Sequence, residues 1–148
     1  MRRSTRSFLF PDVNVWIALT YRAHKHYFAA KGWLDSLPED VVLCFCRLTQ
    51  LGFLRLLTTP AVMQNQTRSQ AEAWAVYDEW LRNGSAEFIE EPPGVEPAFR
   101  ALTQSGQPAP KDWADSYVLA FAQSSGLKLV TFDQGLHRRT ANSLLLGL

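Results

Sequence analysis

Apolar and polar positions alternate so that two strands, each followed by helices, occupy the first part of the chain. Ser7 to Val13 predicts a strand with Phe8 and Phe10 on one face. Val41 to Cys46 is a continuous apolar run, which is typical of a strand buried on both faces. The helices predicted around these strands cover Asn14 to Thr20, Phe28 to Leu37 (ended by Pro38) and Arg47 to Leu57.

Helical spacing and turn residues organise the second part of the chain in a similar way. Thr67 is a suitable N-cap for a long helix that Asn83-Gly84 ends. Asp112 to Ser125, ended by Gly126, predicts another helix. The other predicted elements are a strand from Glu87 to Glu90, a turn at Pro92-Pro93-Gly94, a helix from Val95 to Ser105, a loop through Gly106, Pro108 and Pro110, and a last strand from Leu127 to Phe132.

This order of strands and helices has the spacing of right-handed βαβ crossovers. It predicts an α/β fold with three layers, α/β/α, around a central parallel sheet of four or five strands. At 148 residues, without an internal repeat or a long linker, the chain is expected to form a single domain over residues 1–148.

Composition excludes several classes of protein and leaves others open. With 47% apolar and 20% charged residues the sequence is that of a globular protein. No apolar run approaches the roughly 20 residues of a membrane span. Met1 to Ser7 is basic like the start of a signal peptide, but the apolar stretch after it stops at Pro11-Asp12, so a cytoplasmic protein without a membrane partner is expected. The net charge of +1 neither indicates nor excludes a nucleic-acid partner.

Three aspartates stand where apolar runs end. Asp12 follows the first predicted strand, Asp133 follows the last, and Asp115 lies in the first turn of the helix from Asp112. The carboxyl ends of parallel strands and the nearby helix N-termini share one edge of a sheet. Carboxylates gathered there repel one another unless cations neutralise them, and this arrangement favours a Mg²⁺ site.

Each acid also has a simpler explanation when taken alone. Asp112 is a suitable N-cap, with Asp115 as the acidic partner of a capping-box-like arrangement, and Asp12 and Asp133 suit turns or caps. Asp115, however, shares a helix face with Leu119 and Ala122 and is expected to point inward without a local basic partner. A bound cation would offset the free-energy cost of burying this unpaired carboxylate.

Four sequence blocks in this order resemble the PIN-domain family and, within it, VapC-type toxin ribonucleases of toxin–antitoxin pairs. The blocks span nearly the whole chain. They are Asp12-Val13-Asn14-Val15-Trp16, the segment from Cys46 to Thr58, Trp113 to Ala122, and Leu129-Val130-Thr131-Phe132-Asp133.

The resemblance implies a metal-dependent endoribonuclease that hydrolyses RNA phosphodiester bonds with Mg²⁺ or Mn²⁺. It implies that Asp12, Asp115 and Asp133 are the catalytic metal-site acids. Its expected partners are RNA, a small cognate antitoxin protein whose tail occupies the acidic cleft, and a second copy of the chain in a homodimer. The supporting residues that it implies are Asn14 and Thr131, which hydrogen-bond around the site, and Asp112 as an accessory acid or cap.

One position departs from the family pattern. A glutamate usually stands just before a Phe-Leu-Arg-like segment, and here that place is taken by Gly52, before Phe53-Leu54-Arg55. The site then has one carboxylate fewer. Three explanations follow: a single ion suffices, water and Gln50 fill the gap, or activity has been lost.

Loss of activity is the basis of the alternative function, a catalytically inactive PIN-like scaffold that binds RNA or protein. A receiver-like phosphoacceptor domain is disfavoured because Val41 to Cys46 leads into Arg47 and no lysine follows Lys128. The sequence also contains candidates for phosphate contacts, each of which could instead be a solvated charge or a salt-bridge partner: Arg47, Arg55, Lys111 and His137-Arg138-Arg139.

Overall fold

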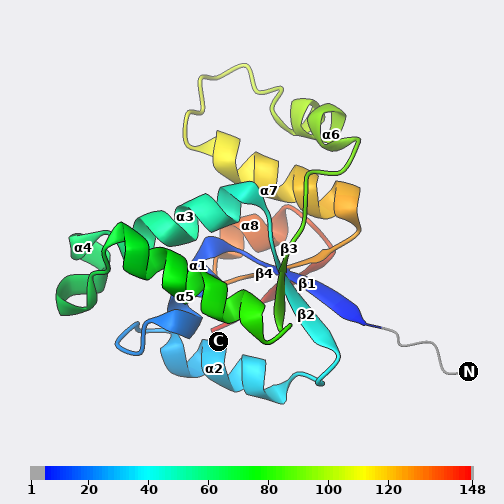
Figure 1. Cartoon of the computed structure of the whole chain (residues 1–148). Helices are drawn as coiled ribbons and strands as arrows, with labels where there is room; N and C mark the ends of the chain where they lie inside the picture. Colours follow the sequence, from blue (N-terminus) through cyan, green and yellow to red (C-terminus); the bar gives the residue numbers. More distant parts are fainter. Residues whose placement is uncertain (1–5, 148) are drawn as a thin grey trace, which may run out of the picture.

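The protein is built on a parallel sheet of five strands in the order β3-β2-β1-β4-β5 (Figure 1). A computed structural model of the chain describes residues 6–147, so most of the basic segment Met1 to Ser7 lies outside the described residues. The sheet confirms the predicted α/β class. Its strands are β1 (Ser7–Pro11), β2 (Val41–Phe45), β3 (Ala86–Phe88), β4 (Lys128–Thr131) and β5 (Ser143–Leu145).

Helices cover both faces of the sheet, which gives the three predicted layers (Figure 1). One layer contains α1 (Val13–Thr20), α2 (Tyr27–Ser36), α3 (Arg47–Leu57), α4 (Pro60–Met63) with the short 3₁₀ turn η1 (Gln64–Gln66), and α5 (Gln70–Arg82). The other contains α6 (Val95–Leu102), α7 (Asp112–Ser125) and α8 (Gln134–Arg138).

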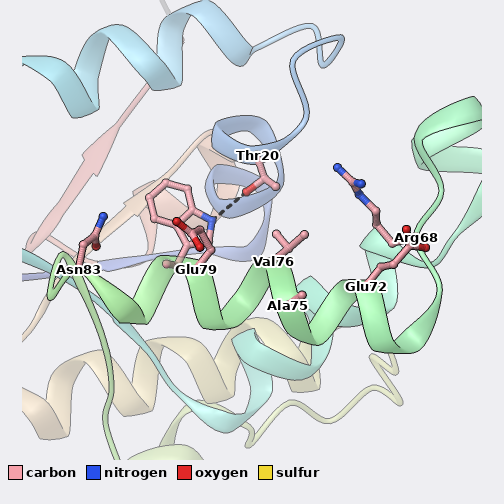
Figure 2. Close-up of a pocket in the computed structure, with 8 residues that line it drawn as sticks. Thr20, Arg68, Glu72, Ala75, Val76, Glu79 and Asn83 are labelled. Atoms are coloured by element: carbon pink, nitrogen blue, oxygen red, sulfur yellow. Dashed lines mark hydrogen bonds between the residues drawn. The ribbon is translucent and has the colours of Figure 1, made fainter.

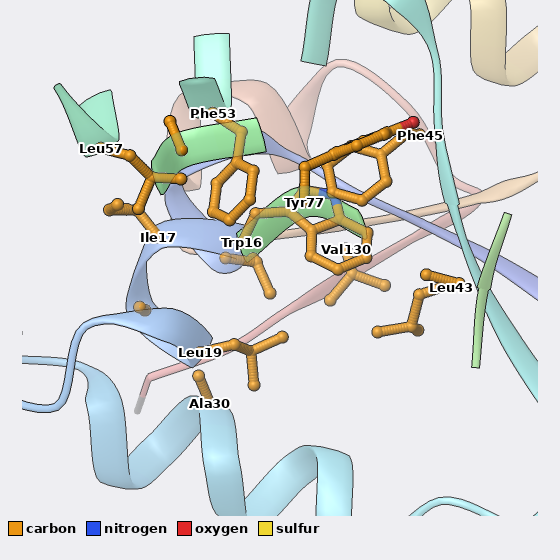
Figure 3. Packing of buried hydrophobic residues seen from close by; sticks show 14 of the residues in the cluster. Trp16, Ile17, Leu19, Ala30, Leu43, Phe45, Phe53, Leu57, Tyr77 and Val130 are labelled. Atoms are coloured by element: carbon orange, nitrogen blue, oxygen red, sulfur yellow. The ribbon is translucent and has the colours of Figure 1, made fainter. Parts of the chain in front are cut away.

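Alternating strand residues divide the core between these two layers. Phe45 and Val130 face the α1 side, where Trp16 stacks on Phe45 with ring centroids 3.8 Å apart (Figure 3). Phe10 and Leu129 face the α7 side. This alternation follows from the two-residue period of a strand and explains why continuous apolar runs form these strands.

Cys44 and Cys46 lie on the α7 side, where both are buried and neither forms a disulfide bond. No helix within residues 6–147 is long and apolar enough to cross a membrane.

Several predicted boundaries were wrong by a few residues, and two predicted caps were wrong. The N-cap of α5 is Ser69 rather than Thr67, because Ser69 forms a reciprocal capping box with Glu72. Asp112 is the first helical residue of α7 rather than its N-cap, which is Lys111. The predicted strand at Glu87 to Glu90 is shifted to Ala86–Phe88, and the helix predicted to reach Ser105 ends at Leu102.

The sequence reading also missed three elements near ends and turns. These are α4 with η1, the five-residue α8, and β5, which adds a fifth strand beside β4. Both α8 and β5 follow Asp133, so they determine what surrounds the last of the candidate acids.

Candidate functional site

Asp12 lies at the carboxyl edge of the sheet, where β1 and β4 pair side by side. Its backbone N–H donates to the Val130 carbonyl oxygen at 2.8 Å, which places the end of β1 against the end of β4. Its carboxylate accepts a hydrogen bond from the N–H of Val13 at 2.8 Å and another from the hydroxyl of Thr131 at 3.2 Å. Asp12 is therefore both the N-cap of α1 and an acid fixed in orientation by β4.

Asn14 and Thr131 support this acid as the sequence predicted. Thr131 is fully buried, and its hydroxyl oxygen accepts from the Asn14 side-chain amide at 3.3 Å while it donates to Asp12. The side-chain carbonyl oxygen of Asn14 accepts a hydrogen bond from the backbone N–H of Phe132 at 3.4 Å. The two side chains thus tie the start of α1 to the end of β4.

Asp133 comes two residues after Thr131 on the same edge. Its N–H donates to the Thr131 hydroxyl oxygen at 3.0 Å, and its carboxylate accepts from the N–H of Leu136 at 3.1 Å. It is the N-cap of α8 and is exposed to solvent. Asp133 therefore has a structural task in addition to any role toward a ligand.

Asp115 is partly buried in the first turn of α7. Asp12, Asp115 and Asp133 are together called the acid edge. Burial, then the nearby charge of Asp133, raises the pKa of the Asp115 carboxyl, while Arg139 opposes the rise. Burial also raises the pKa of Asp12, and the charges of Asp115 and Asp133 add to that rise against the lowering effect of its hydrogen bonds. The structure thus brings the three predicted acids within electrostatic reach of one another.

Asp112 is engaged differently. The Arg139 guanidinium donates to its carboxylate at 2.8 Å and to the buried Ser116 hydroxyl at 2.9 Å, and Ser116 donates to Asp112 at 2.9 Å. Asp112 is therefore the counterion of Arg139 rather than a free acid. The sequence reading missed Ser116, although its position four residues after Asp112 places both on one helix face.

The donor set fits a hard divalent cation. Carboxylate oxygens are the ligands that Mg²⁺ and Mn²⁺ prefer. Within residues 6–147, ion pairs reach Asp112 but none of Asp12, Asp115 and Asp133, and Arg139 offsets only part of the pKa rise of Asp115. No three His, Cys, Asp or Glu side chains of this range form a compact ligand cluster. The Asp12 and Asp133 carboxylates each accept a hydrogen bond from a backbone N–H group.

Gln50 does not join the acids. It is buried, its carbonyl oxygen accepts from Arg47 at 2.6 Å, and its side chain also hydrogen-bonds Tyr77 of α5. The Gln50 side chain is thus engaged by Arg47, and its substitution for the absent glutamate stays a prediction. Gly52, by contrast, does face the start of α1, where a Cβ atom would meet Val13.

Of the other residues predicted to contact phosphates, some have structural partners and others are exposed to solvent. Arg47 lies over the Phe88 ring at 4.6 Å, and His137 bonds the Ser143 hydroxyl at 2.6 Å, so both have structural partners. Arg55 and Lys111 are exposed, and Arg139 is the basic side chain that reaches the acid edge.

A separate cavity of about 580 Å³ lies beside α5 and is not lined by the candidate acids (Figure 2). Its floor is formed by Ala75, Val76 and Trp80, and Arg68 stands at one end. The Nε atom of Arg68 is buried and has no hydrogen-bond partner within the described part of the chain.

Comparison with known proteins agrees with this geometry. The PIN domain family model matches residues 9–142. Ribonuclease VapC41 of Mycobacterium tuberculosis is 40% identical over 129 residues, which are 84% of this chain and 88% of that protein.

Two solved structures share the fold at low identity. VapC20 of Mycobacterium tuberculosis, described as a toxin that cleaves the sarcin-ricin loop, has a TM-score of 0.63 and 16% identity, over 90% of this chain and 95% of its own. VapBC2 from Rickettsia felis, bound to a DNA fragment from its promoter, has a TM-score of 0.64 and 13% identity, over 93% and 96%.

Proposed function

The chain belongs to the PIN-domain family, as a VapC-type toxin, and on that premise we propose that it is a metal-dependent endoribonuclease of a type II toxin–antitoxin pair. The observation that carries this proposal is the edge where Asp12, Asp115 and Asp133 interact electrostatically without a basic partner of their own. The reaction is hydrolysis of RNA phosphodiester bonds, performed by a single domain over residues 1–148.

Each residue of the edge has a role in this reaction. Asp12 and Asp115 would hold a Mg²⁺ or Mn²⁺ ion through their carboxylate oxygens, and Asp133 would be a further ligand or would orient the attacking water. When bound, the ion polarises a phosphoryl oxygen and lowers the pKa of that water. Thr131 keeps the Asp12 carboxylate aimed at the edge by donating a hydrogen bond to it at 3.2 Å, and Asn14 in turn donates to the Thr131 hydroxyl oxygen at 3.3 Å.

Arg139 is the residue positioned to receive the substrate. Its guanidinium is held by Asp112 and Ser116, three residues before and one residue after Asp115 in the chain. A side chain fixed at this place, and about a third exposed, can donate further N–H groups to a phosphate beside the acids.

The direct test incubates purified protein with a mixed RNA pool, with and without Mg²⁺ or Mn²⁺, beside an Asp115→Ala variant. We expect cleavage only with the divalent ion and only with Asp115 present. Cleavage that persists in chelator or in the variant would contradict the mechanism.

A catalytically inactive PIN-like scaffold is the second candidate, and Gly52 in place of an acid is the observation that favours it. It predicts no RNA cleavage at any Mn²⁺ concentration. It also predicts that Asp12→Asn leaves RNA or protein binding unchanged. Binding assays that compare the unmodified chain with the variant test this.

The antitoxin is the expected protein partner, and the cavity beside α5 supplies a surface that suits it. The apolar floor accepts the apolar face of a helix or an extended segment. Arg68, Glu72 and Glu79 also line the cavity, so charged side chains of both signs on that segment would find a partner there. If this is the docking surface, Val76→Asp and Arg68→Ala will reduce co-purification with a co-expressed small protein encoded beside the gene, while Asp78→Asn on the exposed side of α5 will not.

A different groove, between α3 and α7, is the candidate surface for the expected homodimer. Leu51 and Trp113 are 61% and 53% exposed, and both line a groove of about 440 Å³ between α3 and α7. Exposed apolar groups that share one groove are typical of an interface. Light scattering of Leu51→Asp should then report a monomer where the unmodified chain reports a dimer.

A further inference from the structure

The turn between α1 and α2, residues 21–26, carries positive charge without any acid. The chain has no Asp or Glu between Asp12 and Asp35, whereas Arg22, Lys25 and two histidines all fall in this turn. Arg22 and Lys25 are exposed, and neither forms an ion pair in the part of the chain that the structure describes. We call this segment the basic turn, and its charge is available to a partner.

The basic turn lies at the same edge of the sheet as the acids. The His26 ring stacks on the Phe132 ring with centroids 4.4 Å apart, and Phe132 directly precedes Asp133. From there α2 runs back to the start of the sheet, where the N–H of Ser7 donates to the carbonyl oxygen of Asp40 at 3.3 Å (Figure 1). The start of α2 is therefore at the carboxyl edge and next to the acid edge.

Hydrogen bonds hold the basic turn in shape. The N–H of His24 donates to the carbonyl oxygen of Tyr21 at 2.9 Å, and the N–H of His26 donates to Nδ1 of His24 at 3.0 Å. Burial lowers the pKa of His24, and the positive charges of His26 and Lys25 lower it further. A bound anion would relieve this repulsion between side chains that are already in position.

An exposed aromatic ring follows these charges. Phe28, in the first turn of α2, is 81% exposed, more than any other large apolar side chain within residues 6–147. Proteins bind single-stranded nucleic acid with this combination, because cations contact the phosphates and aromatic rings stack on the bases. In a duplex the base faces are covered by their neighbours, so only an unpaired base can stack on such a ring.

We propose that the basic turn and Phe28 bind single-stranded RNA beside the acid edge, with Arg22 and Lys25 on phosphates and the Phe28 ring on a base. The inference rests on the proposed function, because it concerns the RNA that this function cleaves. The acids repel phosphates, so cations next to them are needed to hold the strand. Arg139 supplies one on the α7 side, and the basic turn supplies others on the α1 side, where Phe132 packs.

Contact with a protein is the alternative use of this surface, since an acidic peptide is also attracted by the cations. RNA is favoured because the basic turn adjoins the edge that the substrate has to reach. The two partners make different demands on Phe28. A base needs a flat aromatic face, whereas a protein contact accepts any apolar side chain of similar size, so Phe28→Leu separates them.

The experiment measures binding of a fluorescein-labelled single-stranded RNA of mixed sequence to the full chain, by fluorescence anisotropy over a series of salt concentrations. Chelator is present, so that binding is measured apart from metal-dependent cleavage. The variants are Arg22→Ala/Lys25→Ala, Phe28→Leu and Phe28→Trp. Lys128→Ala is the matched charge control, because Lys128 is exposed at the start of β4, on the opposite edge of the sheet. Inorganic polyphosphate, which has charge but no bases, is the second ligand.

We expect Arg22→Ala/Lys25→Ala to weaken binding of both ligands and to make the slope of log K against log salt for RNA shallower by about 1.4, the effect of two phosphates. Phe28→Leu should weaken RNA binding about 5- to 150-fold, as for the loss of one stacked base, and leave polyphosphate binding unchanged. Phe28→Trp should keep the affinity for RNA, since an indole ring also stacks. Lys128→Ala should alter neither ligand.

Unchanged RNA affinity in Phe28→Leu or in Arg22→Ala/Lys25→Ala would overturn the inference, and so would an unmodified chain that does not bind RNA in chelator. If these variants keep their RNA affinity but no longer co-purify with a co-expressed small protein encoded beside the gene, the surface belongs to a protein partner and the inference is again overturned. Cleavage by the unmodified chain in Mn²⁺ would leave the proposed function intact in each case. The expected pattern of binding without any cleavage would instead contradict the proposed function and support the inference.

Discussion

Replacing Asp115 by asparagine should make the metal-free protein more stable while it removes cleavage. Asp115 is partly buried in α7, and burial together with the charges of Asp133 and Asp112 raises the pKa of its carboxyl. Its charged form is therefore disfavoured in the folded protein. Asparagine has nearly the same shape and no charge, and none of the influences on this carboxyl is a hydrogen bond that would be lost.

The expected gain is modest because solvent screens a partly exposed group. We expect the free energy of unfolding in chelator to rise by about 1 kcal/mol, within the range for relieving a strained functional site. For a chain of this length that corresponds to a melting temperature about 2–4 °C higher.

The sign of the pH dependence follows from the direction of the shift. Since the folded pKa lies above the ordinary 3.8, the folded protein holds more protons than the unfolded chain in the window just above that value. The unmodified protein therefore loses stability as pH rises through the window. The advantage of Asp115→Asn should be absent below pH 3.8 and complete at neutral pH.

Thermal melts in chelator and in Mn²⁺ provide the assay, with Asp78→Asn on the exposed side of α5 as the matched control. At an Mn²⁺ concentration of about 100 times Kd the unmodified chain should gain about 2.7 kcal/mol, and Asp115→Asn should gain far less. The reasoning is refuted if Asp115→Asn is less stable than the unmodified chain in chelator at neutral pH. It is equally refuted if both proteins respond alike to Mn²⁺.

Three further predictions follow from particular contacts. Arg139→Ala should cost about 1 kcal/mol of stability, because a partly exposed ion pair with Asp112 is lost. The rate of RNA cleavage should fall at least tenfold, which corresponds to about 1.4 kcal/mol of transition-state binding. Unchanged single-turnover rates would exclude a role of Arg139 in substrate binding. Phe53→Ala removes a fully buried ring and should cost about 3–5 kcal/mol in urea unfolding, so a loss below 1 kcal/mol would contradict the packing. Burial raises the pKa of Cys44 to about 12 and also raises that of Cys46, so a thiol reagent at pH 8 should label neither residue until the chain unfolds; rapid labelling of the native protein would be inconsistent with their place in the core.

Much of the fold was predictable because its strong elements carry local signals. β2 is an apolar run between polar flanks, and α7 ends at Gly126, whose φ of 66° is the left-handed conformation that glycine adopts readily. The misplaced start of α5 was avoidable, since Ser69 and Glu72 have the capping-box spacing. α8 and β5 were not predictable in the same way, because each is short, β5 is only half-buried, and Leu136 is the one buried residue of α8.

In the same way, some contacts around Asp12, Asp115 and Asp133 were predictable from the sequence and others were not. That Asp12 meets Thr131 follows from sheet logic, since the neighbouring strands β1 and β4 end at one edge. The pairing of Asp112 with Arg139 depends on where α8 turns, and the sequence reading did not contain α8. The contact between Val13 and Gly52 depends on how closely α1 approaches α3, which no local pattern specifies.

The three acids of the edge differ in what else they do, and this difference decides which substitution isolates the metal role. Asp12 caps α1 and is bonded to Thr131, while Asp133 caps α8. Removing either carboxylate to alanine costs a helix cap of about 1 kcal/mol in addition to any ligand. Asp115 neither caps a helix nor accepts one of these bonds. A loss of cleavage in Asp115 variants that keep or gain stability can therefore be assigned to the ion, whereas the same loss in Asp12 or Asp133 variants mixes chemistry with folding.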